Sequence, residues 1–288
     1  MEHEGFVHVR GLRIYYRSEG EPAKGTLLVF HGGPGYTYDY LTPLFELAER
    51  GYRVVIYEQA GSGKSQAPKN PARYTIESFV EDGEGVRKGL GLGKVNLLGF
   101  SWGGMLAQAY ALKYQSNLTS LVLSGTSPSI PMLEKEATRL LDALPAGTRE
   151  AIAKYEAAGE FTNPEYGEAV REFNRRHSSL LAKTPDPVKY SEEHASAEVG
   201  NALFGPNIIE ATGSMRYWDV TDRLHTLRVP CLIICGEQDF LTPRLHRVMH
   251  QKIKGSRLVI LKRAAHLTMW DARGPYIKAV AGFLDSVH

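Results

Sequence analysis

A serine at position 101 lies between two glycines in the pentapeptide GFSWG, residues 99–103. The apolar run NLLG leads into this serine, and the alanine-rich run GMLAQAY follows it. This order predicts a strand, a tight turn and a helix. A serine on such a strained turn exposes its hydroxyl, and the N-terminus of the following helix directs backbone N–H groups toward a developing anion. The pattern predicts that Ser101 is a nucleophile rather than part of a structural turn.

A serine hydroxyl reacts only when a base removes its proton and a carboxylate orients that base. After this type of serine turn, the acid and then the histidine follow along the chain. His266 is the best placed of the ten histidines, because it lies in a loop that follows an expected strand at 257–261. The segment CLIICGEQDFLTP offers Glu237 and Asp239 as the acid. We choose Asp239, although the pattern by itself leaves Glu237 open.

The segment HGGPG, residues 31–35, directly follows the apolar run TLLVF. Glycine lets a backbone N–H approach a substrate oxygen closely. We therefore expect the N–H groups of Gly33 and Trp102 to form an oxyanion hole, and the alternative is a plain Gly-Pro turn.

The segment EQAGSGKSQ, residues 58–66, is similar to a phosphate-binding loop but does not match one. A P-loop would need glycine at Glu58, and a dinucleotide fingerprint would need glycine at Gln66. We expect a turn beside the site and no nucleotide. The histidines and carboxylates also lack metal-ligand spacing of the H-E-x-x-H kind, so we expect neither a metal nor a cofactor.

Short β-rich runs alternate with helical runs over most of the chain, which predicts an α/β fold with a mostly parallel twisted sheet and helices on both faces. The expected strands are 12–17, 26–30, 53–57, 95–98, 118–124, 231–235 and 257–261. The expected helices between and after them are 40–50, 76–90, 102–114, 244–252 and 275–287. His246 and His250 lie on one of these helices.

The alternation fails between 127 and 222, where the periodicity is helical and no strand is expected. A helix at 131–144 carries Leu133, Ala137, Leu140, Leu141 and Leu144 on one face. Asn163 and Pro164 form a cap and first turn for another helix. We therefore predict a core domain at 1–126 and 223–288 and an all-helical cap domain at 127–222.

Composition is that of an ordinary globular protein, with 43% hydrophobic and 23% charged residues among 288. The 34 Lys and Arg against 32 Asp and Glu leave a net charge of +2, which provides no electrostatic reason to expect nucleic acid or an anionic membrane as a partner. The first twenty residues lack the apolar core of a signal peptide, and no run approaches the roughly 18 apolar residues of a membrane span. We expect a cytoplasmic protein.

The two cysteines, Cys231 and Cys235, lie in one expected strand. Four strand residues span about 13 Å, which is beyond the limit of about 7 Å for a disulfide. We expect buried, free thiols.

Several motifs occur in one order along nearly the whole chain: HGGPG, Y-E-Q-x-G-x-G-x-S at 57–65, GFSWGG, NPEYGEAV, FGPN, YWDVTD, GEQDFLTP and HLTMWD. This series resembles the α/β-hydrolase peptidases called proline iminopeptidases, in particular the archaeal tricorn-interacting type. The resemblance implies an α/β-hydrolase fold with a helical lid over the pocket. It also implies a catalytic triad of Ser101, Asp239 and His266 and an anion site at Gly33 and Trp102, and it favours Asp239 over Glu237.

One departure from this family concerns its substrate pocket. Relatives of this type hold a free N-terminal ammonium with acidic side chains after G-P-N and beside the triad acid, and here these positions are Ile208 and Phe240. A desolvated ammonium without a carboxylate costs several kcal/mol. Glu198 or Glu210 of the lid are candidates to compensate. Trp218 is among the lid aromatics that are candidate pocket residues, although aromatic residues at helical spacing are more often core.

The expected function is that of a cofactor-independent serine hydrolase that acts through an acyl-enzyme on a small-molecule or short-peptide substrate. The resemblance favours an aminopeptidase or amidase that releases an N-terminal residue, often proline. Ile208 and Phe240 favour instead a hydrolase of a neutral ester, lactone or blocked amide. A ligand-binding protein without turnover is a third hypothesis, against which the predicted triad and anion loop argue.

Overall fold

The computed structural model describes residues 2–206 and 210–287. Its eight described strands form one sheet in the order β1-β2-β4-β3-β5-β6-β7-β8. The strands are β1 (Glu2–Val9), β2 (Leu12–Glu19), β3 (Thr26–Phe30), β4 (Arg53–Tyr57), β5 (Val95–Phe100), β6 (Leu118–Ser124), β7 (Cys231–Gly236) and β8 (Arg257–Leu261). The pairs β1–β2 and β2–β4 are antiparallel, and the others are parallel. The predicted fold class is confirmed.

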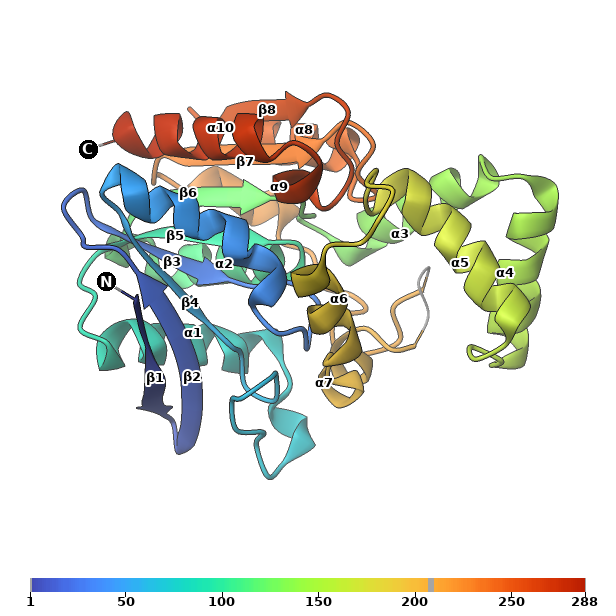
Figure 1. Ribbon diagram of the computed structural model, residues 1–288, viewed down its shortest axis with the longest axis horizontal. Helices are drawn as coiled ribbons and strands as arrows, with labels where there is room; N and C mark the ends of the chain where they lie inside the picture. Colours follow the sequence, from blue (N-terminus) through green and yellow to red (C-terminus); the bar gives the residue numbers. More distant parts are fainter. Residues whose placement is uncertain (1, 207–209, 288) are drawn as a thin grey trace.

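Helices cover both faces of this sheet (Figure 1). They are η1 (Asp39–Arg50), α1 (Ile76–Gly89), α2 (Trp102–Tyr114), α8 (Pro243–Lys252), α9 (Thr268–Asp271) and α10 (Arg273–Asp285), with short 3₁₀ turns η2 (Pro71–Arg73), η3 (Gln115–Asn117) and η4 (Thr221–Thr226). One buried apolar cluster packs α1 and α2 on one face, and a second packs η1 and α10 on the other. The expected helix at 40–50 forms, but as a 3₁₀ helix with Pro43 inside it.

Strand β1 was not predicted, and its composition explains why. It reads EHEGFVHV, a sequence of low apolar content, and only Val7 and Val9 are buried. The chain reverses at Arg10 and Gly11, both of which have positive φ. Two such residues favour a tight hairpin between antiparallel strands. The Arg-Gly pair was therefore the local signal for this hairpin.

Five helices occupy most of the stretch that we predicted as a cap. They are α3 (Ile130–Asp142), α4 (Ala146–Ala158), α5 (Pro164–His177), α6 (Asp186–Glu193) and α7 (Ala197–Leu203). The Asn163 side chain accepts a hydrogen bond from the N–H of Glu165, as its predicted position at the N-terminus of this helix requires. The only β pairing of this stretch, among its described residues, is an isolated bridge between Ser129 and Asp219.

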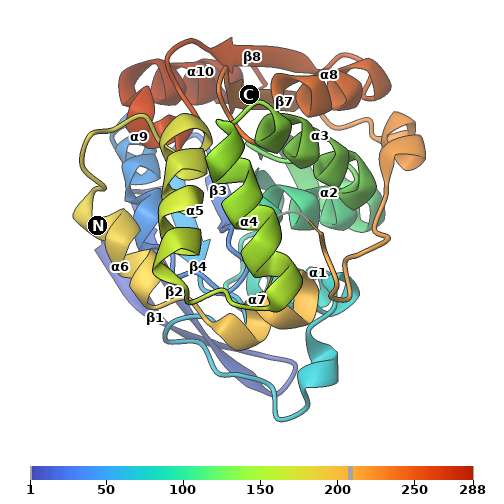
Figure 2. The same cartoon turned by 90° about the vertical axis from the view of Figure 1, so that its right-hand side faces the viewer.

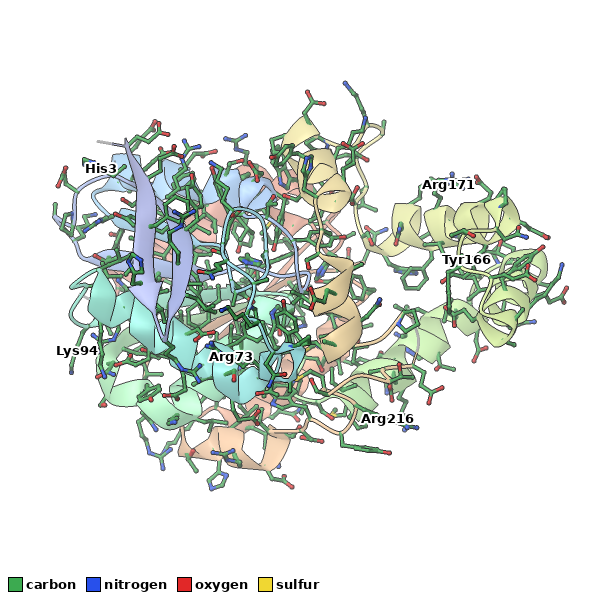
Figure 3. All side chains as sticks on the ribbon, turned by 90° about the horizontal axis from the view of Figure 1, so that it is seen from below. His3, Arg73, Lys94, Tyr166, Arg171 and Arg216 are labelled. Atoms are coloured by element: carbon green, nitrogen blue, oxygen red, sulfur yellow. The ribbon has the colours of Figure 1, made fainter. Side chains whose placement is uncertain are left out.

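Helices α4 and α5 project away from the sheet, whereas α6 and α7 lie close to it (Figures 1 and 2). The projecting pair has an apolar cluster of its own, to which the end of α3 contributes Leu140 and Leu141. Tyr166 on α5 is turned toward α4, where its hydroxyl contacts Glu156 at 3.1 Å, and Arg171 lies on the outer side (Figure 3). This arm therefore packs as a unit.

Both cysteines lie on β7, free and buried, as predicted, and burial raises the pKa of each thiol. Within the described ranges, no helix is both long and apolar enough to cross a membrane.

Candidate active site

Ser101 occupies the turn between β5 and α2, as predicted. Its φ of 57° and ψ of −124° are unusual for a residue with a side chain. Two contacts hold it in this conformation. Its N–H donates to the carbonyl of Ser124 at the end of β6, at 2.9 Å, and its own carbonyl accepts from the Thr126 hydroxyl at 2.8 Å. The neighbouring strand therefore supports the strained turn.

The glycines on either side of Ser101 are required by close backbone approach. A Cβ on Gly99 would overlap the carbonyl oxygen of Gly103, and a Cβ on Gly103 would overlap the carbonyl oxygen of Phe30 at the end of β3. Since both obstacles are backbone atoms, neither can rotate away. The glycine spacing is thus a consequence of how tightly β5, α2 and β3 meet.

Gly103→Ala is accordingly expected to lower the free energy of unfolding by about 3 kcal/mol, at the upper end of the usual cost of overpacking. Urea denaturation measures this effect. Gly147→Ala is the matched control, because a Cβ there meets no atom within 4 Å, and alanine in a helix should be neutral or stabilise by up to about 1 kcal/mol. Equal stabilities for the two variants would contradict the close approach described above.

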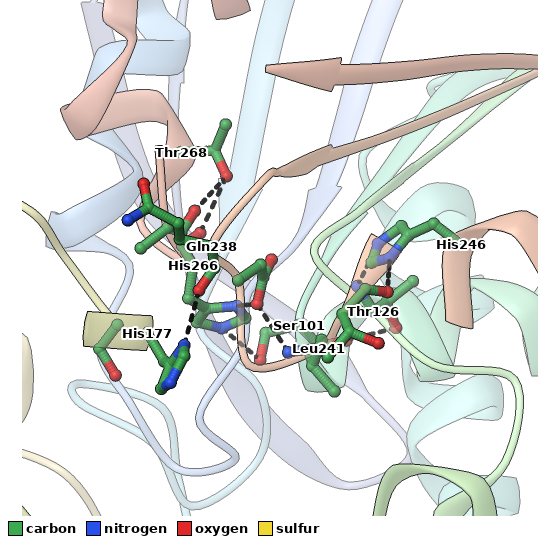
Figure 4. Close-up of polar contacts among 12 residues, drawn as sticks. Ser101, Thr126, His177, Gln238, Leu241, His246, His266 and Thr268 are labelled. Atoms are coloured by element: carbon green, nitrogen blue, oxygen red, sulfur yellow. Dashed lines mark hydrogen bonds and ion pairs between the residues drawn. The ribbon is translucent and has the colours of Figure 1, made fainter. Parts of the chain in front are cut away.

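The three residues predicted as a triad form one hydrogen-bonded chain (Figure 4). His266 Nε2 lies 3.0 Å from Ser101 Oγ, and His266 Nδ1 lies 2.9 Å from Asp239 Oδ1. A carboxylate oxygen only accepts, so Nδ1 carries the proton and Nε2 is free to accept from the serine. Asp239 is 1% exposed, whereas Glu237 is exposed in the preceding turn. The arrangement is therefore able to move the serine proton to the imidazole.

Contacts from the end of α5 and from α9 hold the loops that carry His266 and Asp239. The carbonyl of His177, at the end of α5, accepts from the N–H of His266 at 3.1 Å and of Phe240 at 3.3 Å. The Asp271 carboxylate accepts from the N–H of Ala265 at 2.7 Å. It also accepts from the Ser179 hydroxyl and the Leu180 N–H, which follow α5. Sequence reasoning missed the contacts that His177 makes and those between Asp271 and the residues after α5, because these join segments about 60 to 90 residues apart.

His246 is a second buried histidine near the site, for which the sequence pattern predicts only a place on a helix. Its Nδ1–H donates to the carbonyl of Thr242, and its Nε2 accepts from the N–H of Thr126, both at 3.0 Å. Burial lowers the pKa of His246, which favours this neutral form. Because Thr126 in turn binds the carbonyl of Ser101, His246 supports the serine turn from behind (Figure 4).

The HGGPG loop lies directly against the serine. A Cβ on Gly32 would come within 2.8 Å of the Ser101 Cβ, and Gly33 has a φ of 114° that favours glycine. In the parts of the chain that the structure describes, the N–H groups of Gly33 and Trp102 have no hydrogen-bond partner. Both predicted donors are therefore available at the loops that flank Ser101.

The segment at 58–66 forms a turn beside this loop, as expected. Glu58 is buried in it and accepts from the backbone N–H of Lys64 at 2.5 Å, and Gly63 packs so closely that a Cβ would overlap the carboxylate. Burial raises the pKa of Glu58 from its ordinary 4.5 to about 7, with a smaller contribution from Asp39. A buried carboxylate of this kind makes folding depend on pH.

Glu58 should destabilise the protein progressively as the pH rises from 4.5 to 7. Between these values the folded chain keeps the Glu58 proton and the unfolded chain has lost it, so stability falls through this window and the full penalty is present above pH 7. The advantage in unfolding free energy of Glu58→Gln over wild type should therefore grow by about 2–3 kcal/mol from pH 5 to pH 8. Urea denaturation across this range measures the difference, and parallel profiles would contradict it.

The predicted pocket residues lie in different places. The Phe240 ring packs against the His266 ring, with centroids 4.3 Å apart, and against Phe173 of the cap at 6.4 Å. Ile208 lies outside the described residues. Phe240 is thus the one described member of this set that contacts the triad.

Glu198, Glu210 and Trp218 have surroundings of their own. Glu198 is exposed on α7, and Glu210 pairs with Arg216 at 3.2 Å. Trp218 lines a groove of about 410 Å³ between α1, α2 and the segment before η4. Ser101 is not among the residues that line this groove. Among the described residues, no hydrogen bond, ion pair or ring contact joins these three residues to Ser101, His266 or Asp239, and their role in the pocket stays a prediction.

Comparison with known proteins gives one consistent family. Residues 25–272 match the model of the alpha/beta hydrolase fold family. The chain is 42% identical to a proline iminopeptidase of Thermoplasma volcanium over 98% of this chain and 96% of that protein, and 39% identical to one of Saccharolobus solfataricus over 99% and 93%.

Two solved structures are similar over the same length. A proline iminopeptidase of Mycobacterium smegmatis superposes with a TM-score of 0.92 at 31% identity, covering 99% of this chain and 98% of that one. The structure of VinJ superposes with a TM-score of 0.95 at 29% identity, covering 99% of both chains.

Proposed function

Because this chain belongs to the proline iminopeptidase family of α/β hydrolases, we propose that it releases an N-terminal residue, most often proline, from small peptides or amides through an acyl-enzyme. The observation that carries this proposal is the hydrogen-bonded chain from Ser101 through His266 to Asp239. The names of the relatives support the peptidase activity, and the geometry supports the mechanism.

In this mechanism Ser101 Oγ attacks the substrate carbonyl carbon while its proton passes to His266 Nε2. The carbonyl oxygen becomes an anion, which the N–H groups of Gly33 and Trp102 stabilise. Asp239 holds the Nδ1 proton and stabilises the imidazolium. His266 then gives its proton to the leaving amine as the C–N bond breaks, and an ester to Ser101 remains. Water, activated by the same imidazole, hydrolyses this ester and restores the serine.

A second candidate function follows from Phe240. Its ring lies 4.3 Å from that of His266, so the surface beside the triad is apolar at a position where the family resemblance implies a carboxylate. An ammonium placed there would lose its hydration without an ionic partner, which costs several kcal/mol. This contact favours a neutral ester, lactone or blocked amide as substrate.

Three chromogenic substrates separate the two functions: proline p-nitroanilide, its N-acetyl form and p-nitrophenyl acetate. The peptidase function predicts a higher kcat/KM for the free amine than for its acetylated form. The reverse order would instead support the second function, and turnover of the ester shows only that an acyl-enzyme forms, because a p-nitrophenyl ester is intrinsically more reactive than an anilide. Ser101→Ala serves as the control for spontaneous ester hydrolysis.

A further inference from the structure

A buried glutamine, Gln59, connects the two loops that carry the proposed oxyanion donors. We propose that Gln59 is a positioning residue that sets the separation of the Gly33 and Trp102 N–H groups, and this inference rests on the proposed serine mechanism. It acts through His31 on one side and through the Trp102 indole on the other.

The order of strands places Gln59 where it reaches both loops. β4, β3 and β5 are neighbours and run parallel, so their carboxyl ends meet at one edge of the sheet. Gln59 follows β4, the HGGPG loop follows β3, and Ser101 follows β5. A side chain that starts beyond β4 and reaches α2 must therefore cross the base of the loop after β3.

Two hydrogen bonds fasten Gln59 to the start of the HGGPG loop. Its side-chain Nε2–H donates to the carbonyl of His31 at 2.8 Å, and its backbone N–H donates to His31 Nε2 at 2.9 Å. His31 Nδ1–H donates to the carbonyl of Gly32 at 2.8 Å. The buried imidazole is thus neutral, and burial lowers the pKa of His31 to about 4. This pairing fixes the loop immediately before Gly33.

The other end of the Gln59 side chain holds the residue after the nucleophile. Gln59 Oε1 accepts from the Trp102 indole N–H at 2.8 Å. The indole is 1% exposed and packs edge-on against Phe79 at 5.8 Å and Phe204 at 6.0 Å. Because the indole and the Trp102 backbone N–H belong to one residue at the start of α2, fixing the ring fixes the direction of that N–H.

This single side chain therefore links both proposed donors through short, buried contacts. An oxyanion forms only in the transition state and the tetrahedral intermediate, so misplaced donors should slow chemistry while binding of a planar ground state changes little. Misplacement of about 1 Å costs up to about 10²-fold in rate. A residue that merely stabilises the fold would not discriminate between planar and tetrahedral ligands.

The experiment compares Gln59→Leu and Trp102→Phe with Gln108→Leu as the matched control. Gln108 is also fully buried, and its side chain donates to the carbonyls of Gly104 and Ser127 at 3.1 and 2.9 Å. Gln108→Leu therefore removes two similar hydrogen bonds without loosening the HGGPG loop. Thermal unfolding of each variant shows how much stability each loss costs.

We expect Gln59→Leu to lower kcat by about 10- to 100-fold, with KM within about twofold, on the best of the chromogenic substrates. Phenylboronic acid, which forms a tetrahedral adduct with serine, should bind more weakly in proportion to kcat/KM, whereas planar benzoate should bind as to wild type. Gln108→Leu should keep kcat and both affinities. Trp102→Phe should reproduce part of the loss in kcat and in boronate affinity. The double variant Gln59→Leu/Trp102→Phe should lose no more of either than Gln59→Leu alone, because both substitutions remove the same contact.

Unchanged kcat and boronate affinity in Gln59→Leu, or equal losses in Gln108→Leu, would overturn the role of Gln59. Should Gln59→Leu fail to fold, Trp102→Phe alone decides, because it removes the indole donor and keeps an aromatic ring; wild-type kcat and boronate affinity there would overturn the role. Failure of the serine mechanism itself is separate: Ser101→Ala would then keep turnover.

Discussion

Ser101→Ala is expected to lower kcat by about 10⁴- to 10⁶-fold, the range lost when a triad nucleophile is removed. The methyl group leaves His266 Nε2 without the oxygen that lies 3.0 Å away, so no ester forms. Turnover of the best chromogenic substrate measures the loss. Labelling by a fluorophosphonate, which phosphonylates an activated serine, should disappear in the same variant.

Ser120→Ala is the control for this variant. Ser120 is also buried, on β6, where its hydroxyl donates to Asn96 at 2.7 Å. Its loss should cost about 1 kcal/mol of stability and leave kcat within about twofold. Labelling that persists in Ser101→Ala, or vanishes in Ser120→Ala, would refute Ser101 as the nucleophile.

Asp239→Asn is expected to lower kcat by about 10⁴-fold with little change in structure. An amide presents N–H to His266 Nδ1, which reverses the tautomer and puts the proton on Nε2, where it blocks acceptance from Ser101. The amide nitrogen would also face the backbone N–H of Leu241, which donates to Asp239 Oδ1 at 2.8 Å, so the free energy of unfolding should fall by about 1–2 kcal/mol. Steady-state turnover between pH 7 and 10 and the Tm measure the two effects.

Glu237→Gln tests the alternative acid that the sequence pattern left open. Glu237 is exposed, so its neutralisation should leave kcat within about twofold of wild type. If Glu237→Gln loses activity and Asp239→Asn keeps it, the contact between Asp239 and His266 at 2.9 Å is not the one that catalysis uses.

Local patterns were sufficient where a segment forms its structure with its own residues. The apolar runs at Thr26–Phe30, Arg53–Tyr57 and Leu118–Ser124 became strands with the predicted bounds, because buried parallel strands need continuous apolar sequence. The glycines around Ser101 predicted its turn, since close backbone approach excludes a Cβ. Strand β1 was missed because five of its eight residues are exposed and two of these are glutamates.

Choices between nearby residues depended on packing that no local pattern encodes. Glu237 and Asp239 lie two residues apart in one loop. Glu237 is exposed, whereas Asp239 is buried, with 1% exposure, and contacts His266. Likewise, no local pattern predicted that Trp218 would line a groove between α1 and α2. A small change in backbone direction decides which side chain points inward.

The sequence by itself determined the fold class, the positions of most strands and helices, and the serine and histidine that the proposed mechanism uses, and it limited the acid to Glu237 or Asp239. These depend on hydrophobic periodicity and on glycine sterics, both of which are local. Only the tertiary structure decided that Gln59, His246 and His177 support the site. Their partners lie up to 120 residues away along the chain, and such contacts arise from the order of strands in the sheet and from packing in three dimensions.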